Sequence, residues 1–377
     1  MRRVLFAASV VLLLVLGTVP GAAASTATYT VTLDGLAPKG DNWSFLRFFP
    51  ASVTVHRGDV VDAAWAGAGT PHTATVVPDQ YPERWRRQNQ APGDPWALVV
   101  PDAAAGGDDN ELVINPAVLA PSDPTCGASA STPCAFDGSS VVNSGFAFGD
   151  PSNEPAFYVK MDAPAGTYSF VCLVHPGMDL TVNVVDQGAS APTPAQIGAK
   201  ASRQFNKATK IWGELADRQA QTVVSGHIDA GHKVFTLWAG GFSHNVSADE
   251  FPDTPITVRV GDSVQVLGNF EIHTATIPSG SVDSVPFTVS QCEVAGADTP
   301  AAGPQDCADP SQFQVALNPQ AIAPTASLAL SAPGAFVNSG LISAPSSTVF
   351  TAEKPGTYTI VCLVHGPAMS TRIKVIG

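Results

Sequence analysis

Short runs of alternating apolar and polar residues make up most of this sequence, and glycine and proline separate them. Residues 166–172 (Gly-Thr-Tyr-Ser-Phe-Val-Cys) and 356–362 (Gly-Thr-Tyr-Thr-Ile-Val-Cys) are two clear cases. A period of two places successive side chains on opposite faces of a strand. The 33 glycines and 32 prolines supply the turns. The pattern predicts an all-β fold of many short strands.

The two halves of the chain repeat this pattern. Residues 166–175 match residues 356–365 almost one for one, and Val-Asn-Ser-Gly occurs at 142–145 and again at 337–340. A length of 377 residues supplies two hydrophobic cores. We therefore predict two β-sandwiches with Greek-key connections. Between a His-Thr-Ala-Thr segment (72–75 or 273–276) and the Val-Asn-Ser-Gly element, each half carries a long insert rich in Pro, Ala, Asp and Gly. Such an insert either covers a site or is partly disordered.

One segment between the repeats has a helical period. From Pro194 to about Thr222, apolar side chains recur three or four residues apart, as in an amphipathic helix. They are Ile197, Ala201, Phe205, Ala208, Trp212 and Leu215. We predict a linker at 188–222 whose helix joins a first domain at 25–187 to a second at 223–377.

Each repeated strand ends in a cysteine, and a histidine and a methionine follow in the next turn. In chain order these residues are Cys172, His175, Met178, Cys362, His365 and Met369. A further histidine stands well upstream in each half, His72 and His273, both within His-Thr-Ala-Thr. A thiolate, two imidazoles and a weak thioether are the ligands of a blue-copper electron-transfer site. The sequence therefore predicts one copper site in each half.

The duplicated ligand pattern resembles the cupredoxin family, which includes plastocyanin, azurin and amicyanin. The resemblance extends upstream to the strand-and-turn segments 49–59 and 251–262. It covers most of the mature chain apart from the inserts and the linker. It implies two tandem cupredoxin-like domains that hold two type 1 copper ions and act in electron transfer.

The two methionine-bearing turns differ in length. Two residues separate His175 from Met178, a short spacing that resembles that of amicyanin, whereas three separate His365 from Met369. The second spacing departs from the commonest ones in the family. Because the axial ligand tunes the potential of such a site, we expect the two copper sites to differ.

An enzyme of this duplicated fold would need a second copper centre. Two-domain nitrite reductases and small laccases have His-x-His pairs and a histidine beside the ligand cysteine. Here both cysteines stand between a valine and a leucine, and no His-x-His occurs. We therefore expect an electron carrier that is not an enzyme. Copper sequestration or delivery is the alternative, and a multicopper oxidase or nitrite reductase relative is the less favoured one.

The start of the chain predicts export. A basic beginning, an apolar run from Val4 to Val19 and three alanines ending at Ala24 form a signal peptide over 1–24, cleaved after Ala24. No later apolar run is long enough to span a bilayer. We therefore expect a secreted or periplasmic protein. In that environment the close pairs Cys126 with Cys134 and Cys292 with Cys307 are expected to form disulfides.

Charge bears on the partner more than on the fold. Without the two arginines of the signal peptide, the 19 basic residues fall to 17 against 32 acidic ones, a net charge of −15. Such a surface repels nucleic acid and anionic membrane. It either favours a cationic redox partner or serves solubility alone. The identity of that protein is not encoded in any motif.

Four histidines lie outside the predicted copper sites. His56 aligns with Arg259, so its position tolerates any polar group and is expected to face solvent. The others are His227, His232 and His244. They could form an adventitious metal site, but ordinary surface histidines are the favoured interpretation.

Overall fold

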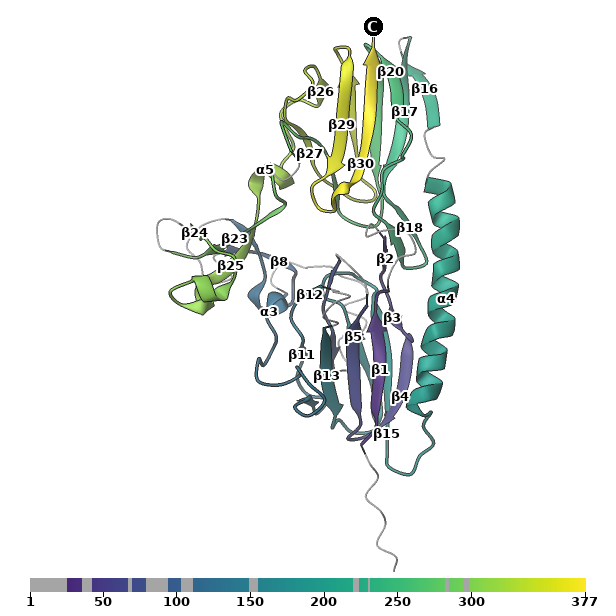
Figure 1. The fold of residues 1–377 in the computed structure, drawn as a ribbon, viewed down its shortest axis with the longest axis vertical. Coiled ribbons are helices and arrows are strands. Elements are labelled where there is room, and N and C mark those ends of the chain that lie inside the picture. Colours follow the sequence, from purple (N-terminus) through teal and green to yellow (C-terminus); the bar gives the residue numbers. More distant parts are fainter. Residues whose placement is uncertain are drawn as a thin grey trace, which may run out of the picture.

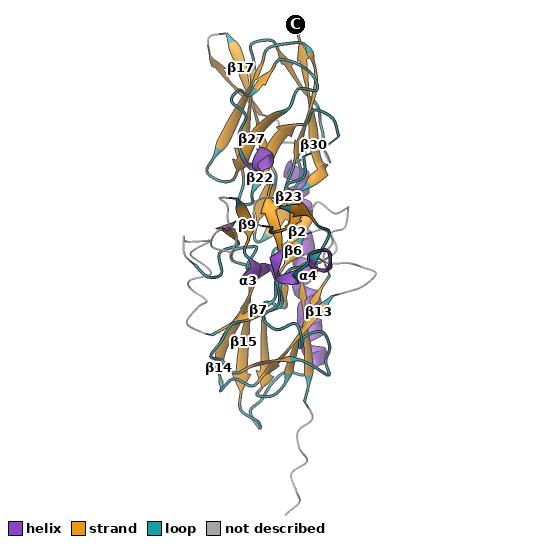
Figure 2. Cartoon of the chain, turned by 90° about the vertical axis from the view of Figure 1, so that its left-hand side faces the viewer, coloured by secondary structure: helices purple, strands orange, loops and turns teal. Residues whose placement is uncertain are grey.

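Two β-sandwiches lie end to end along the long axis of the molecule (Figure 1). This arrangement comes from a computed structural model, and the predicted signal peptide 1–24 lies outside the residues it describes. The described residues are 26–35, 43–66, 70–78, 94–102, 111–148, 155–219, 224–229, 231–281, 285–294 and 298–377. Strands dominate them, with few helices (Figure 2), as the alternating pattern predicted. Within these residues no helix is long and apolar enough to span a bilayer.

Two five-stranded sheets form the first sandwich. The order β10-β13-β5-β1-β3 corresponds to Cys134–Phe136, Ala156–Met161, Val60–Trp65, Thr28–Leu33 and Phe48–Phe49. The order β11-β7-β14-β15-β4 corresponds to Val142–Asn143, Thr75–Val77, Gly166–Val171, Asp179–Val185 and Ser52–His56. Alternate side chains of both sheets point inward and form one apolar core. A separate two-stranded pair joins β12 (Ala147–Phe148) to β6 (Pro71–His72).

The second sandwich repeats this plan. The order β16-β17-β21-β28-β26 corresponds to Val224–Asp229, His232–Ala239, Ser263–Gly268, Ser347–Ala352 and Ala329–Leu330. The order β20-β30-β29-β22-β27 corresponds to Ile256–Arg259, Gly366–Ile376, Gly356–Cys362, His273–Ile277 and Val337–Ile342. Its apolar core is separate from that of the first sandwich.

A repeated Gly-Asp turn explains one of the matches between the halves. Gly58 and Gly261 have φ values of +92° and +93°, a conformation that favours glycine. The carboxylate of Asp59 accepts hydrogen bonds from the backbone N–H groups of His56 and Ala27. Asp262 does the same in the second domain. These carboxylates close the turns that lead into β5 and β21.

The predicted helix is present and packs against both domains. Helix α4 spans Pro194–Gln219 and runs beside the junction (Figure 1). It contacts β1 and β3 of the first domain and two strands of the second, β18 (Gly241–Ser243) and β19 (Val246–Ala248). Its apolar face forms a small core with Trp43, whose ring centroid lies 4.7 Å from that of Trp212. The helix thereby holds the domains together.

Two antiparallel sheets that contain strands of both halves also join the domains. Strand β2 (Trp43–Phe45) of the first domain pairs with β19 and extends the β18–β19 hairpin of the second. The two inserts share one sheet of order β24-β23-β25-β9-β8, formed by Thr299–Pro300, Thr288–Cys292, Phe313–Leu317, Leu112–Ile114 and Val99–Pro101. The predicted division into a first domain at 25–187, a linker at 188–222 and a second domain at 223–377 stays a prediction. Strands from the first of these parts pair with strands from the last.

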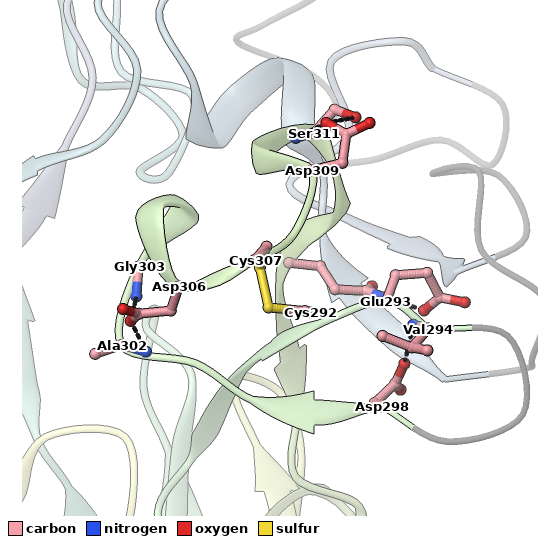
Figure 3. Close-up of a disulfide and its surroundings, with 11 residues drawn as sticks. Cys292, Glu293, Val294, Asp298, Ala302, Gly303, Asp306, Cys307, Asp309 and Ser311 are labelled. Carbon is pink, nitrogen blue, oxygen red and sulfur yellow. Dashed lines mark hydrogen bonds between the residues drawn. A yellow bond between two sulfur atoms is a disulfide. The ribbon is translucent and has the colours of Figure 1, made fainter.

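The described parts of the inserts also contain short helices and both predicted disulfides. The helices are α3 (Pro116–Leu119), η2 (Pro304–Asp306), η3 (Pro310–Gln312) and α5 (Pro319–Ile322). Cys126 is bonded to Cys134, and Cys292 to Cys307, as predicted. The second bond ties the end of β23 to the segment that follows η2 (Figure 3). The inserts are therefore braced structures in these parts.

Candidate metal centres

The structure brings together three predicted ligands in the first domain. His72 ends β6, Cys172 follows β14, and His175 lies in the turn beyond it. The Sγ atom of Cys172 lies 3.7 Å from Nδ1 of His72 and 3.5 Å from Nδ1 of His175. The two Nδ1 atoms are 3.1 Å apart. One sulfur and two nitrogens therefore face a common point.

The second domain repeats this arrangement. The Sγ atom of Cys362 lies 3.9 Å from Nδ1 of His273 and 3.5 Å from Nδ1 of His365. The two Nδ1 atoms are again 3.1 Å apart. His273 begins β22 and Cys362 ends β29, so neighbouring strands of one sheet supply these two ligands.

The two methionines are buried in the cores that contain the cysteines. Met178 belongs to the same apolar cluster as Cys172, and Met369 to that of Cys362. In the first turn, the Met178 N–H donates to the His175 carbonyl, and its carbonyl accepts from the Cys172 N–H. Met369 instead lies within β30. The longer second turn therefore places its methionine in a different backbone setting.

Repeated polar residues hold the cysteine strands in place. Thr73 Oγ1 accepts a hydrogen bond from the backbone N–H of Leu173 at 2.9 Å, and Thr274 accepts one from Leu363 at 2.8 Å. Both threonines therefore fix the residue that directly follows a cysteine. Both threonines belong to the repeated His-Thr-Ala-Thr segments, and this repeat was the sequence signal for their role. The pattern of predicted ligands alone did not indicate it.

The repeated Asn-Ser-Gly element supports the same loops. The Asn143 side chain accepts a hydrogen bond from Thr75 and donates to carbonyls at the end of α3. Asn338 makes the equivalent bonds to Thr276 and around α5. Both side chains are fully buried. Each therefore links the insert of its domain to the strand that follows the upstream histidine.

The outer nitrogens of the upstream histidines have different partners. His72 Nε2 lies 3.1 Å from Oδ2 of Asp34, whereas His273 Nε2 lies 2.8 Å from Oδ1 of Asn269. A partner on the outer nitrogen orients an imidazole so that its other nitrogen faces the metal. Sequence reasoning missed both partners, because Asp34 and Asn269 occur in no repeated motif.

The two upstream histidines have shifted pKa values of opposite direction. Burial alone would lower the pKa of His72, but its hydrogen bonds to Asp34 and Cys172 raise that pKa to about 10. Burial and the nearby His365 instead hold the pKa of His273 well below its usual value. The two centres are therefore alike in their donor atoms and unlike in their charge.

The donor set fits copper. Thiolate and imidazole are the ligands of the trigonal His₂Cys copper site, with a weak thioether as the axial ligand. Burial would raise the pKa of Cys172, but the hydrogen bonds from His175 and His72 outweigh it and lower that pKa well below the usual value. The Cys172 thiolate is therefore the favoured form before any metal binds.

A third group of potential ligands lies beside the second centre. It consists of Asp249, Glu271 and His365, whose ligand atoms all lie within 4.8 Å of one another. Sequence analysis missed it because the three residues come from distant segments without a motif. The group uses the outer nitrogen of His365, so it is distinct from the Nδ1 site.

The remaining histidines do not form a metal site among the described residues. His56 is partly exposed, and its Nε2 lies 2.9 Å from the Ala189 carbonyl oxygen. His232 is exposed, and His244 Nδ1 contacts the hydroxyl of Ser243. Neither belongs to a potential ligand group. The side chain of His227 lies outside the described residues.

Cupredoxins and two-domain copper proteins are among the solved structures that are similar to this chain. The chain is similar to reduced auracyanin from Roseiflexus castenholzii, with 16% identity over 43% of this chain and 98% of that one, at a TM-score of 0.23. It is similar to the Cu-containing nitrite reductase of Thermus scotoductus SA-01, with 13% identity over 93% and 68% and a TM-score of 0.23. The fold is cupredoxin-like, in two tandem domains. Neither a protein-family model nor a curated protein matches the sequence.

The comparison corrects the expectation that this cupredoxin-like chain is not an enzyme. The structures similar to it over 93% of its length include that nitrite reductase and the Blue Copper Oxidase of Nitrosomonas europaea, the latter with 13% identity over 86% of its own chain and a TM-score of 0.19. Both are named as enzymes. The expectation rested on missing local motifs, but ligands from distant segments can meet at a domain junction, as Asp249, Glu271 and His365 do. The missing motifs therefore do not exclude catalysis.

Proposed function

We propose that each domain binds one type 1 copper ion and that the protein transfers electrons. The main support for this proposal is that one Sγ and two Nδ1 atoms converge in each domain, at separations of 3.1 to 3.9 Å. Met178 and Met369 are the proposed axial ligands. When bound, copper would supply one-electron chemistry between Cu(I) and Cu(II).

The protein's own contribution is a donor set that is held in place and largely buried. His72, Cys172, His273 and Cys362 are each at least 95% buried. Hydrogen bonds fix the outer nitrogens of both upstream histidines and the residues after both cysteines. Donors held in this way need little rearrangement when the charge at the centre changes, which is the property an electron-transfer site requires.

We also propose that the protein acts outside the cytoplasm with a cationic redox partner. The predicted signal peptide supports export. The net charge of −15 for the mature chain, 17 basic against 32 acidic residues, supports a partner of opposite charge. Copper sequestration is the competing function, and it does not require a reversible potential or fast electron self-exchange.

We expect the copper-loaded protein to show two one-electron steps in a redox titration followed at the blue band. Axial ligation tunes the potential, and the two methionines stand in unequal turns. Met178→Leu should move mainly one step and Met369→Leu mainly the other. Each variant is the control for the other, because leucine preserves an apolar side chain of similar size.

A single step at one shared potential, unchanged by either substitution, would remove the methionines from the ligand set. Absence of a reversible potential at both sites would instead favour sequestration over electron transfer.

A further inference from the structure

Two carboxylates, those of Asp249 and Glu271, lie near Nε2 of the proposed copper ligand His365 where the domains join. Asp249 follows β19, the strand that pairs with β2 of the first domain. Asn245, in the turn before β19, donates to the carbonyl of Gly177 in the Met178 turn at 3.1 Å. Residues 245–249 therefore extend from the turn between His175 and Met178 in the first domain to His365 in the second.

The distances from His365 to the two carboxylates fit coordination of one shared metal ion better than direct hydrogen bonds. His365 Nε2 lies 3.8 Å from Oδ2 of Asp249 and 3.9 Å from Oε2 of Glu271. An N–H···O hydrogen bond requires about 2.7 to 3.2 Å. Neighbouring ligands around a tetrahedral ion with bonds of about 2.1 Å lie about 3.4 Å apart. Small movements of two side chains would bring all three atoms onto one ion.

Both carboxylates are buried, and both face the imidazole of His365. Asp249 is 3% exposed, and the side chain of Glu271 is 8% exposed. Among the described residues, no lysine or arginine pairs with either one. Two buried like charges are unfavourable, and a bound cation would offset them.

The protein also orients these groups toward one point. The Ser247 hydroxyl donates to Oδ1 of Asp249 at 3.0 Å, which leaves Oδ2 facing His365. The backbone N–H of Glu271 donates to Oδ1 of Asn269 at 2.8 Å. Among the described residues, no group donates a hydrogen bond to the Glu271 carboxylate. Its oxygens therefore have free lone pairs within a buried junction.

We propose that Asp249, Glu271 and His365 bind a third metal ion, a divalent first-row cation such as Zn²⁺. His365 would use Nε2 for this ion and Nδ1 for the copper of the second domain, and the Nε2 proton would pass to water on binding. Carboxylate and imidazole together suit such cations. Three protein ligands leave a coordination position open for water, as in catalytic rather than structural zinc sites.

The test counts metal ions rather than redox activity, so its failure is distinguishable from failure of the copper assignment. Protein carrying two copper ions is mixed with excess Zn²⁺, freed of unbound metal and analysed for both elements. We expect one zinc per wild-type chain with both coppers retained. Glu271→Gln and Asp249→Asn should each weaken zinc binding about tenfold or more, and the blue colour should remain.

Glu250→Gln is the matched control. It removes one negative charge beside Asp249, but its Oε1 accepts the Trp43 indole N–H at 2.6 Å and lies outside the ligand group. This variant should hold zinc as the wild type does. A second readout is the copper spectrum, because zinc on the shared imidazole should shift the signal of the second site in wild type and in neither ligand variant.

Three results would overturn the proposal. One is a wild-type chain that retains no zinc. Another is zinc binding that is unchanged in both Glu271→Gln and Asp249→Asn. The last is zinc that binds only as copper is lost, which would place it in the copper sites.

Discussion

Cys172→Ser is expected to remove about half of the blue absorbance of the copper-loaded protein, and Cys362→Ser the other half. The colour of such a centre depends on the copper–thiolate bond, which a serine hydroxyl does not supply. Both cysteines are buried and free of disulfides. The double variant should therefore be colourless. Absorbance and elemental analysis of the same samples measure the outcome.

The comparison of the two single variants provides the control. The cores of the domains are separate clusters, so the second centre should keep its spectrum when Cys172 is replaced. If one substitution abolished all colour while the other had no effect, the second of these cysteines would not be a copper ligand.

Asp34→Asn is expected to lower the copper affinity of the first site about 10- to 100-fold, the range measured for outer partners of metal ligands. Asp34 Oδ1 already accepts the backbone N–H groups of Gly35 and Phe45. Asparagine that kept these bonds would turn its NH₂ group toward His72 Nε2–H, so two donors would face each other. Because the negative charge is also lost, Cu(II) is less stabilised and the potential of the first site should rise.

The backbone should tolerate this substitution. Asp34 has a φ of +60°, a conformation in which asparagine is among the most favoured non-glycine residues. The second site is the internal control, since its upstream histidine has the neutral partner Asn269. Copper competition and redox titration measure both sites in one sample. An unchanged first site would show that Asp34 has only a structural role.

The sequence revealed those parts of the fold that depend on local pattern. Alternation predicted the strands, the helical period predicted α4, and the duplicated Cys-x-x-His spacing predicted which donors would converge. Each of these follows from side chains a few residues apart or from repetition. Even the supporting threonines and Asn143 with Asn338 were visible as repeats, although their hydrogen bonds were not.

Contacts between distant segments were not predictable in this way. Pairing of β2 with β19, and of the two inserts in one sheet, depends on how the domains dock. Asp34 and His72 are distant in sequence and contact each other inside the first domain. Asp249 lies near His365 only at the junction of the domains. The same limit explains the incorrect exclusion of an enzyme, since motifs report on neighbours in sequence rather than on ligands assembled by docking.

Copper analysis with visible absorption of the mature wild-type protein tests whether each domain holds one type 1 copper ion. After copper loading and removal of unbound metal, we expect an intense blue colour from two type 1 ions, one on each set of His, Cys and His donors. The measurement needs the ratio of copper to protein and the absorbance per copper. A chain that retains a single type 1 copper, or that binds copper without the blue band, would contradict the assignment of two type 1 copper sites.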